Sequence, residues 1–177
     1  MTIIHKLFSF FDKIKPARIA YAHCDIPCGI YDPHLAQMAA HTIIRMVTLI
    51  DELVAGMKAN QNPTAEERRD FVHKLSRCTV VKEKHADTCD HEIITLWGDY
   101  FKPEHFQKYP QLNELTFKVM KLTGKARQEV NMQAAEELLE TVNKIAEIFW
   151  ETKGMGTTRF PAPYPTAKET VYPTSKK

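Results

Sequence analysis

One short loop near the N-terminus holds residues whose types and spacing suit a metal ion. His23, Cys24 and Cys28 supply an imidazole and two thiols within six residues. Pro27 and Gly29 favour a tight turn, which can bring both sulfurs onto one ion. Two thiolates with nitrogen donors suit nickel, copper or zinc. A loop disulfide between the two cysteines is the alternative, and the adjacent histidine argues against it.

The residues before this loop have the pattern of a processing site. Ala20-Tyr21-Ala22 places small residues at alternate positions, a pattern after which processing peptidases cut. Cleavage after Ala22 would make His23 the N-terminus, and its amine, with a pKa near ~8, could lose its proton to a metal. The amine, the imidazole and the Cys24 backbone nitrogen would then join the two sulfurs as donors.

The loop resembles the metal-binding hook of the nickel superoxide dismutases. That hook reads His-Cys-Asp-x-Pro-Cys-Gly-x-Tyr-Asp-Pro, and residues 23–33 match every fixed position. Residues 97–110 and 148–153 agree with two further stretches of the family, so the resemblance spans about residues 1–153. It implies that the chain converts superoxide to dioxygen and hydrogen peroxide, with a nickel ion cycling between Ni(II) and Ni(III).

The resemblance also implies the ligands of the hook, residues 23–31. His23 would bind nickel through its amine and imidazole, Cys24 through its amide nitrogen and sulfur, and Cys28 through its sulfur. A maturation peptidase would remove residues 1–22 by cutting just before the histidine. The mature chains would form a homohexamer.

Other residues are expected to surround the metal without binding it. By resemblance, Asp25, Tyr31 and Tyr100 belong to the catalytic surroundings, where the two phenols border the substrate channel. Their structural alternatives are a turn cap for the aspartate and packing for the tyrosines. Pro27 would follow a cis peptide bond, and Lys102 could add a positive field that attracts superoxide.

Two positions depart from the family pattern. Family members often support the axial imidazole with a glutamate and an arginine, and this chain has Ala39 and His85 there. His85 could replace that support directly or through water, or it could be a neutral core histidine. A separate metal site at His85 and Cys89 would lack evident further ligands. The other helix histidines are expected to be solvated or hydrogen-bonded: His41, His73 and His91.

Composition fits one globular domain with appendages. The 177 residues are 44% apolar, enough for one core, and carry a net charge of +2. Residues 1–22 hold a net +3 of that charge, which leaves −1 on the remainder and gives no indication of nucleic-acid binding. The apolar run at residues 7–11 is too short for a secretory signal, and no stretch reaches ~20 apolar residues. We therefore expect a cytoplasmic protein without a membrane segment.

Four amphipathic helices are expected to position these residues. Asp32 can cap the first helix, and residues 64–67 form a capping box for the second. Cys78 and Cys89 would lie about 16 Å apart along the second helix, beyond the reach of a disulfide. The expected helices span about residues 33–59, 64–101, 110–122 and 130–152.

The expected architecture is all-α, an antiparallel up-and-down four-helix bundle with an N-terminal hook. Residues 103–110 would form an irregular connection, and no segment is a convincing strand. The Pro-rich end would be a flexible tail. The chain then divides into a cleaved propeptide, the dismutase domain and the tail, at residues 1–22, 23–153 and 154–177.

Two other functions are compatible with the loop. A non-enzymatic carrier could use His23, Cys24 and Cys28 to hold nickel or copper for delivery, and bound nickel that does not cycle would favour it. A thiol redox protein using the two cysteines would keep its activity without metal and lose it on alkylation.

Overall fold

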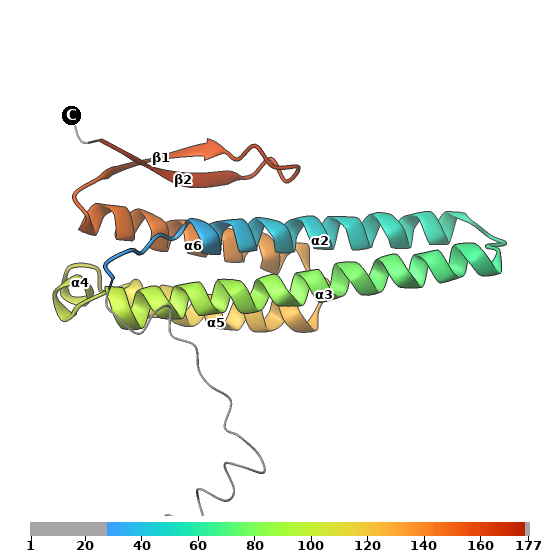
Figure 1. The fold of residues 1–177 in the computed structure, drawn as a ribbon, viewed down its shortest axis with the longest axis horizontal. Helices are drawn as coiled ribbons and strands as arrows, with labels where there is room; N and C mark the ends of the chain where they lie inside the picture. Colours follow the sequence, from blue (N-terminus) through green and yellow to red (C-terminus); the bar gives the residue numbers. More distant parts are fainter. Residues whose placement is uncertain (1–27, 176–177) are drawn as a thin grey trace, which may run out of the picture.

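The computed structural model describes residues 28–175, and that part of the chain is mostly helical (Figure 1). Within it, five α-helices and one π-helical turn precede a two-stranded antiparallel sheet. The elements are α2 (His34–Ala59), α3 (Ala65–Thr95), η1 (Leu96–Tyr100), α4 (Pro103–Lys108), α5 (Leu112–Gln128), α6 (Met132–Thr152), β1 (Gly156–Pro161) and β2 (Glu169–Thr174).

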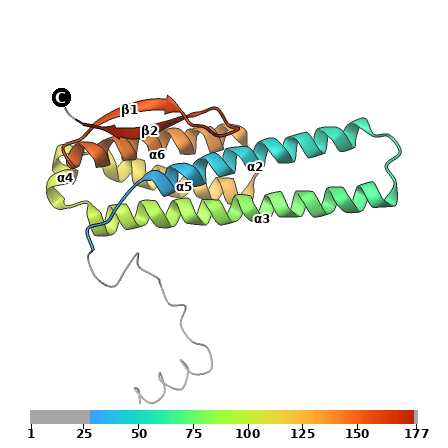
Figure 2. The same cartoon turned by 45° about the horizontal axis from the view of Figure 1, so that its top comes forward.

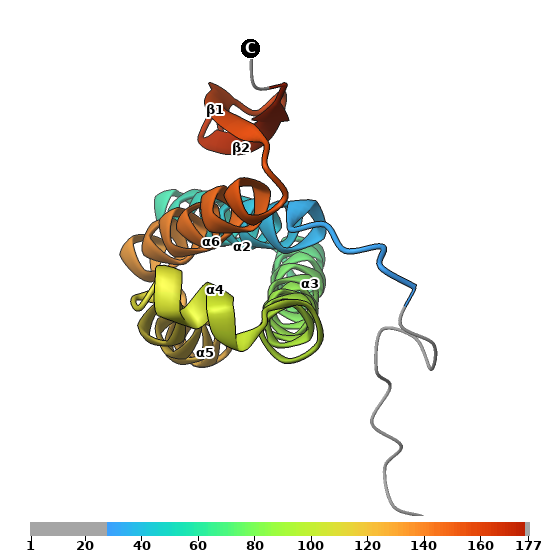
Figure 3. The same cartoon turned by 90° about the vertical axis from the view of Figure 1, so that its left-hand side faces the viewer.

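The four long helices run along the longest axis of the molecule. α2 and α3 pack together as an antiparallel pair, α5 and α6 form a second pair, and α2 contacts α6 while α3 contacts α5 (Figures 1 and 3). Because α2 and α3 are the longer helices, their joined end projects beyond α5 and α6 (Figure 2). The short helix α4 lies across the opposite end.

Side-chain caps explain where several helices begin. The Asp32 Oδ1 accepts the backbone N–H of His34 at 2.7 Å, at the start of α2. At the start of α3, the Thr64 hydroxyl accepts the Glu67 N–H at 3.2 Å and the Glu67 carboxylate accepts the Thr64 N–H at 2.7 Å. These bonds satisfy N–H groups that have no partner inside the helix. Both helix starts that the sequence predicts are confirmed.

The core lies between the four long helices, and the sequence predicts it unevenly. Apolar residues that recur at helical spacing along α6 are all buried: Leu138, Leu139, Val142, Ile145, Ala146 and Phe149. On α3, the residues with this spacing are buried at Cys89, Ile93 and Leu96, whereas Phe71 and Leu75 are only half-buried. The reason is that α5 and α6 do not extend to that part of α3.

The structure corrects two expectations. Residues 103–110, expected to be irregular, contain helix α4, whose first residue, Pro103, needs no N–H donor. Residues 154–177, expected to be a flexible tail without strands, contain the β1–β2 hairpin, with Thr158 opposite Tyr172 in its register. The prolines did not prevent strands because both strands of a two-stranded sheet are edge strands. On an edge strand, proline is tolerated where the missing N–H would point away from the partner strand.

Buried polar contacts attach this hairpin to α2 and α6. The Gln37 side-chain amide donates to Asn143 Oδ1 at 3.0 Å and to the Val171 carbonyl at 3.3 Å. Asn143 in turn donates to the Glu169 carbonyl at 3.0 Å. Val171 is itself buried, so the hairpin covers the outer face of α6 with both apolar and hydrogen-bonded contacts (Figure 3).

His41 is the centre of a second attachment point. Its Nδ1 lies 2.7 Å from the Thr166 hydroxyl and its Nε2 lies 2.7 Å from the Thr170 hydroxyl. The Tyr164 ring packs against the imidazole at 5.1 Å between centroids. Burial, with a smaller contribution from His34, lowers the pKa of His41 to about 4. The sequence predicted that this histidine is either solvated or hydrogen-bonded, and the structure shows that it is hydrogen-bonded.

None of the helices between residues 28 and 175 combines the length and apolarity that crossing a bilayer requires.

Candidate metal centre

The described part of the hook begins at Cys28, a few residues before α2. Cys28 is exposed, and the Ile30 N–H donates to its sulfur with an N···S distance of 3.4 Å. Gly29 between them has φ +72°, a left-handed conformation that glycine adopts without strain. Cys28 is therefore an exposed residue on a turn that leads towards α2. The other predicted residues of the hook lie outside the described residues: His23, Cys24, Asp25 and Pro27.

Tyr31 and Tyr100, both predicted to border the substrate channel, lie side by side. Their ring centroids are 5.5 Å apart with planes at 52°. The Tyr100 ring also packs on Phe149 at 4.6 Å, and its hydroxyl lies 2.7 Å from the Thr152 hydroxyl. Both tyrosines are half-buried, so each phenol has one part fixed by packing and another part accessible.

A π-helical turn positions Tyr100. The Phe101 N–H donates to the Leu96 carbonyl five residues earlier, at 2.9 Å, as the chain leaves α3. Such a turn holds one more residue than an α-helical turn, so it rotates the side chains that follow, and it often occurs at functional sites. The sequence analysis expected only the end of the second helix here, and no simple residue pattern distinguishes the two.

A cleft of about 350 Å³ lies between the start of α2 and the end of α3. Tyr31 and His34 line it from one side, and Glu92 and Thr95 line it from α3. His34, Glu92 and Thr95 were not among the site residues predicted from the sequence. A signal for Glu92 was present, because it lies four residues before Leu96 and therefore on the same face of the helix.

His85 lies elsewhere on α3 and is absent from the lining of this cleft. Its Nδ1 is 2.8 Å from the Val81 carbonyl, a bond within its own helix. Ala39 is buried in the core, with 1% of its surface exposed. His23, the predicted partner of His85, is outside the described residues, so that contact stays a prediction.

Cys89 has no partner ligands for a second metal site among the described residues. Between residues 28 and 175, no group of three or more His, Cys, Asp and Glu side chains could hold a metal ion. Burial raises the pKa of the Cys89 thiol, which keeps it protonated and poorly nucleophilic.

A lysine that the sequence analysis did not select lies against Tyr100. The Lys153 Nζ is 5.4 Å from the centroid of the Tyr100 ring and 4.9 Å from that of Phe149. Lys102, which the sequence suggested for attracting superoxide, is exposed at the start of α4. A cation over an aromatic face gains a modest electrostatic attraction, so Lys153 is held near the tyrosine pair.

The chemistry of these residues fits a soft transition metal. Cys28 offers an exposed sulfur on a turn, and the sequence places a second thiol and an imidazole five residues or less before it. Thiolate and nitrogen donors favour nickel, copper or zinc over magnesium and calcium, which take oxygen ligands.

Comparisons with known proteins agree with this chemistry. The sequence profile of the family "Nickel-containing superoxide dismutase" matches residues 18–153. The superoxide dismutase [Ni] of Streptomyces coelicolor (strain ATCC BAA-471 / A3(2) / M145) is 38% identical over 132 residues, which are 75% of this chain and 88% of that protein. The superoxide dismutase [Ni] of Streptomyces seoulensis is 36% identical over 144 residues, 81% of this chain and 95% of that protein.

Solved structures of nickel superoxide dismutase are also similar. The native structure gives a TM-score of 0.58 at 35% identity and covers 74% of this chain and 99% of its own. The structure with the nickel ligation of the oxidized state gives a TM-score of 0.59 at 34% identity. The match covers 75% of this chain and 99% of that chain. The β1–β2 hairpin lies beyond the matched residues. On these grounds the chain belongs to the nickel-containing superoxide dismutases, oxidoreductases that act on superoxide with a nickel cofactor.

Proposed function

We propose that residues 23–31 form the nickel site and that this site becomes active when residues 1–22 are removed. The ligands are the amine and imidazole of His23, the backbone nitrogen and sulfur of Cys24, and the sulfur of Cys28. When bound, nickel supplies one-electron oxidation and reduction between Ni(II) and Ni(III). The observation that carries the proposal is the exposed Cys28 sulfur at the start of a segment that leads directly to the Tyr31–Tyr100 pair.

The donor set has a physical purpose. Two anionic sulfurs and a deprotonated amide nitrogen donate more electron density than water or neutral imidazoles, and this stabilises the higher oxidation state. The terminal amine exists only after cleavage just before His23, because the nitrogen is otherwise part of a peptide bond. We therefore assign removal of the leader to a maturation peptidase that cuts after Ala22.

The hydrogen bond between Tyr100 and Thr152 fixes which proton the Tyr100 hydroxyl uses. The Thr152 hydroxyl donates to the Phe149 carbonyl at 2.6 Å, so its single proton is used. The Tyr100 hydroxyl, 2.7 Å away, therefore donates to Thr152 and keeps lone pairs that can accept from water. Tyr31 is the phenol that we assign to donate towards the substrate anion. Tyr100 positions the ring of Tyr31 and an ordered water.

The reaction consumes two superoxide anions and two protons and yields dioxygen and hydrogen peroxide. One superoxide loses an electron and the other gains it, so the protein must admit a small anion and supply protons. Lys153 beside Tyr100 attracts the anion, and the phenols hold the water that relays protons.

We assign supporting roles to the remaining predicted residues. Asp25 belongs to the surroundings of the metal together with the two tyrosines, and Pro27 supports the bend of the hook. Lys102, which is exposed, adds positive charge that attracts the superoxide anion. His85 supports the His23 imidazole through water, a role for which Glu92 is a competitor because it lines the cleft beside Tyr31.

We also propose that the protomer is an antiparallel up-and-down four-helix bundle that assembles as a homohexamer in the cytoplasm, with residues 154–177 as an appended hairpin. The packing of α2 with α3 and of α5 with α6 supports the bundle. Large apolar side chains near the hook support subunit contacts, because clustered exposed apolar surface marks interfaces. They are Ile30, 74% exposed, Leu35 and Met38, which line the same cleft beside Tyr31.

The test compares the full chain with a chain that begins at His23 and a matched control that keeps one extra alanine, Ala22. Each is loaded with nickel under reducing conditions and assayed for dismutase activity and for the electron paramagnetic resonance of low-spin Ni(III). We expect activity and the Ni(III) signal only from the chain that begins at His23. Equal activity in all three would refute the amine ligand.

The same samples separate the alternatives. Nickel that binds without an Ni(III) signal or turnover indicates a carrier. Activity in the metal-free chain that is lost on alkylation indicates a thiol redox protein.

A further inference from the structure

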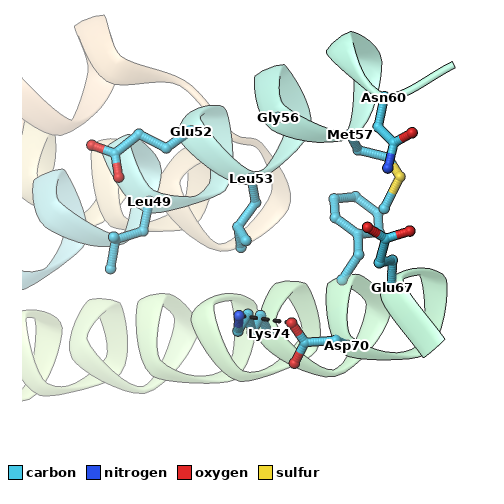
Figure 4. A pocket seen from close by; sticks show the side chains of 10 residues that line it. Leu49, Glu52, Leu53, Gly56, Met57, Asn60, Glu67, Asp70 and Lys74 are labelled. Atoms are coloured by element: carbon cyan, nitrogen blue, oxygen red, sulfur yellow. Dashed lines mark ion pairs between the residues drawn. The ribbon is translucent and has the colours of Figure 1, made fainter. Parts of the chain in front are cut away.

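A groove of about 380 Å³ lies between α2 and α3 near the end where the two helices are joined (Figure 4). Leu49, Leu53 and Met57 line it from α2, and Phe71 lines it from α3. These side chains are half-buried. In Figure 4, Leu49 and Leu53 point from α2 towards the opposite helix.

Among residues 28–175, no helix covers the groove, because the second helix pair is too short. The Lys82 ammonium donates to the Ala126 carbonyl and, at 3.2 Å, to the Arg127 carbonyl, so the end of α5 lies level with Lys82 on α3. The part of α3 before Lys82 extends about 25 Å further at 1.5 Å per residue. Val72 and Val80 on this part are 58% and 59% exposed.

The rim of the groove is acidic. Glu52, Glu67 and Asp70 lie among its lining residues, with Lys74 as the basic residue there. Lys74 pairs with Asp70 at 2.7 Å. The lining therefore carries a formal charge of −2 around an apolar floor, so it suits an occupant that is apolar on one side and basic on the other.

Residues 1–22 of the same chain have that chemistry. They carry a net +3, and the family match begins only at residue 18. Their large apolar residues recur at intervals of three and four, the spacing that places side chains on one face of a helix. Six residues share this face, and Phe10 and Ile19 fall outside it: Ile3, Ile4, Leu7, Phe8, Phe11 and Ile14.

The leader is also long enough to reach the groove. From the start of α2 at His34 to Leu53 the helix rises about 28 Å. The 14 residues from Cys28 back to Ile14 can span about 46 Å when extended. The connection therefore covers the distance even though the hook and the groove lie towards opposite ends of α2.

We propose that the leader seats its apolar face in the α2–α3 groove of its own chain and covers it until cleavage after Ala22. Removing the leader then exposes the groove at the same step that creates the His23 amine. The inference rests on the proposed function only in treating residues 1–22 as a leader. The contact itself needs neither nickel nor dismutase activity.

Amide hydrogen exchange on the full chain tests this contact. Phe8→Asp removes an apolar side chain from the leader, and Ser9→Asp is its control, with the same added charge at the next position, which lies off that face. Both substitutions lie in the leader, so neither alters a residue of the described helices. Docking protects the groove, so we expect Phe8→Asp to speed exchange in residues 49–57 and 67–75 at least about fivefold, and Ser9→Asp to leave it unchanged.

A reciprocal pair changes the groove itself. Leu53→Asp should make residues 1–22 more sensitive to a protease, whereas Ala55→Asp on the exposed side of α2 should not. Identical exchange in the unchanged chain, Phe8→Asp and Ser9→Asp would overturn the proposal. So would protection that survives Phe8→Asp and rises with protein concentration, because a second copy of the chain would then be the occupant.

Discussion

Helix α2 carries two regions that are built in opposite ways. Towards the β1–β2 hairpin, His41 is buried and bonded through both ring nitrogens, and Gln37 contacts Asn143 and Val171. Towards the hook, Tyr31 is half-buried, Cys28 is exposed and an open cleft lies between the start of α2 and the end of α3. The hairpin side therefore contributes to stability, and the hook side leaves groups accessible for chemistry.

The difference implies that stability and catalysis can be changed separately in this protein. A buried polar group that loses its partner costs about 1–3 kcal/mol. An exposed surface group changes the free energy of unfolding by no more than about 0.5 kcal/mol. Variants on the hairpin side of α2 should therefore change the free energy of unfolding. Variants on the hook side should change nickel binding or activity instead.

The largest effect is expected at Cys28. Cys28→Ser removes the sulfur that we propose as a nickel ligand, so we expect loss of the Ni(III) signal and of dismutase activity in the chain that begins at His23. Because the residue is exposed, the free energy of unfolding of the metal-free chain should change by no more than about 0.5 kcal/mol. Cys78→Ser, on the projecting part of α3, is the control and should keep both signal and activity. Activity that survives Cys28→Ser would remove this residue from the site.

The next effect concerns pH and His41. Its pKa is lowered from 6.5 to about 4 by burial, so the unfolded chain binds a proton more readily than the folded chain. The stabilisation is complete above pH 6.5 and is lost as the pH falls towards 4, up to about 3 kcal/mol in total. Arg45 and Tyr164 also face this site, and neither carries a negative charge that could hold the imidazolium near neutral pH.

Denaturant titrations between pH 7 and pH 4 check this prediction. His41→Gln should flatten the pH dependence of the free energy of unfolding, and exposed His73→Gln should leave it as in the unchanged chain. Dismutase activity per folded molecule should be the same in both variants. A pH dependence that is unchanged by His41→Gln would show that the hairpin side does not titrate.

A smaller effect is expected at Glu92. If its carboxylate supports the hook across the cleft, Glu92→Gln should lower nickel affinity about tenfold, the scale of outer ligand contacts. Glu83→Gln, on the exposed side of the same helix, is the matched control. His85→Gln tested beside them distinguishes the two candidates for supporting the His23 imidazole. Nickel affinity measured by competition with a chelator reports the effect without turnover.

The smallest effect is expected at Lys153. Its ammonium lies beside Tyr100, so Lys153→Met should lower kcat/KM for superoxide about two- to threefold at low salt, because less of the anion is attracted. The difference should disappear near ~0.5 M salt, where charges are screened. Lys102→Met makes the same change in net charge at the exposed start of α4. An equal effect of both changes would mean that net charge matters more than position.

Several parts of the fold were predictable because they depend on neighbours in the chain. Helix α6 shows its inward face in the spacing of its apolar residues, and the capping box at Thr64 and Glu67 marks the start of α3. The hairpin was not predictable, because its prolines are typical of a tail. Its stability comes from contacts with Gln37, His41 and Asn143, more than one hundred residues earlier for the two on α2.

By itself, the sequence determined the donor types and the family: a histidine and two cysteines that suit nickel, copper or zinc, within a motif that resembles the hook of the nickel superoxide dismutases. Ligand type and local spacing are properties of the chain, so they can be read without a fold. Only the tertiary structure decided which phenols meet, which lysine lies beside them and which carboxylate lines the cleft. Those pairings depend on the packing of α3 against α2 and on the π-helical turn η1 that follows α3. This turn rotates the side chains after it, and no simple residue pattern predicts it.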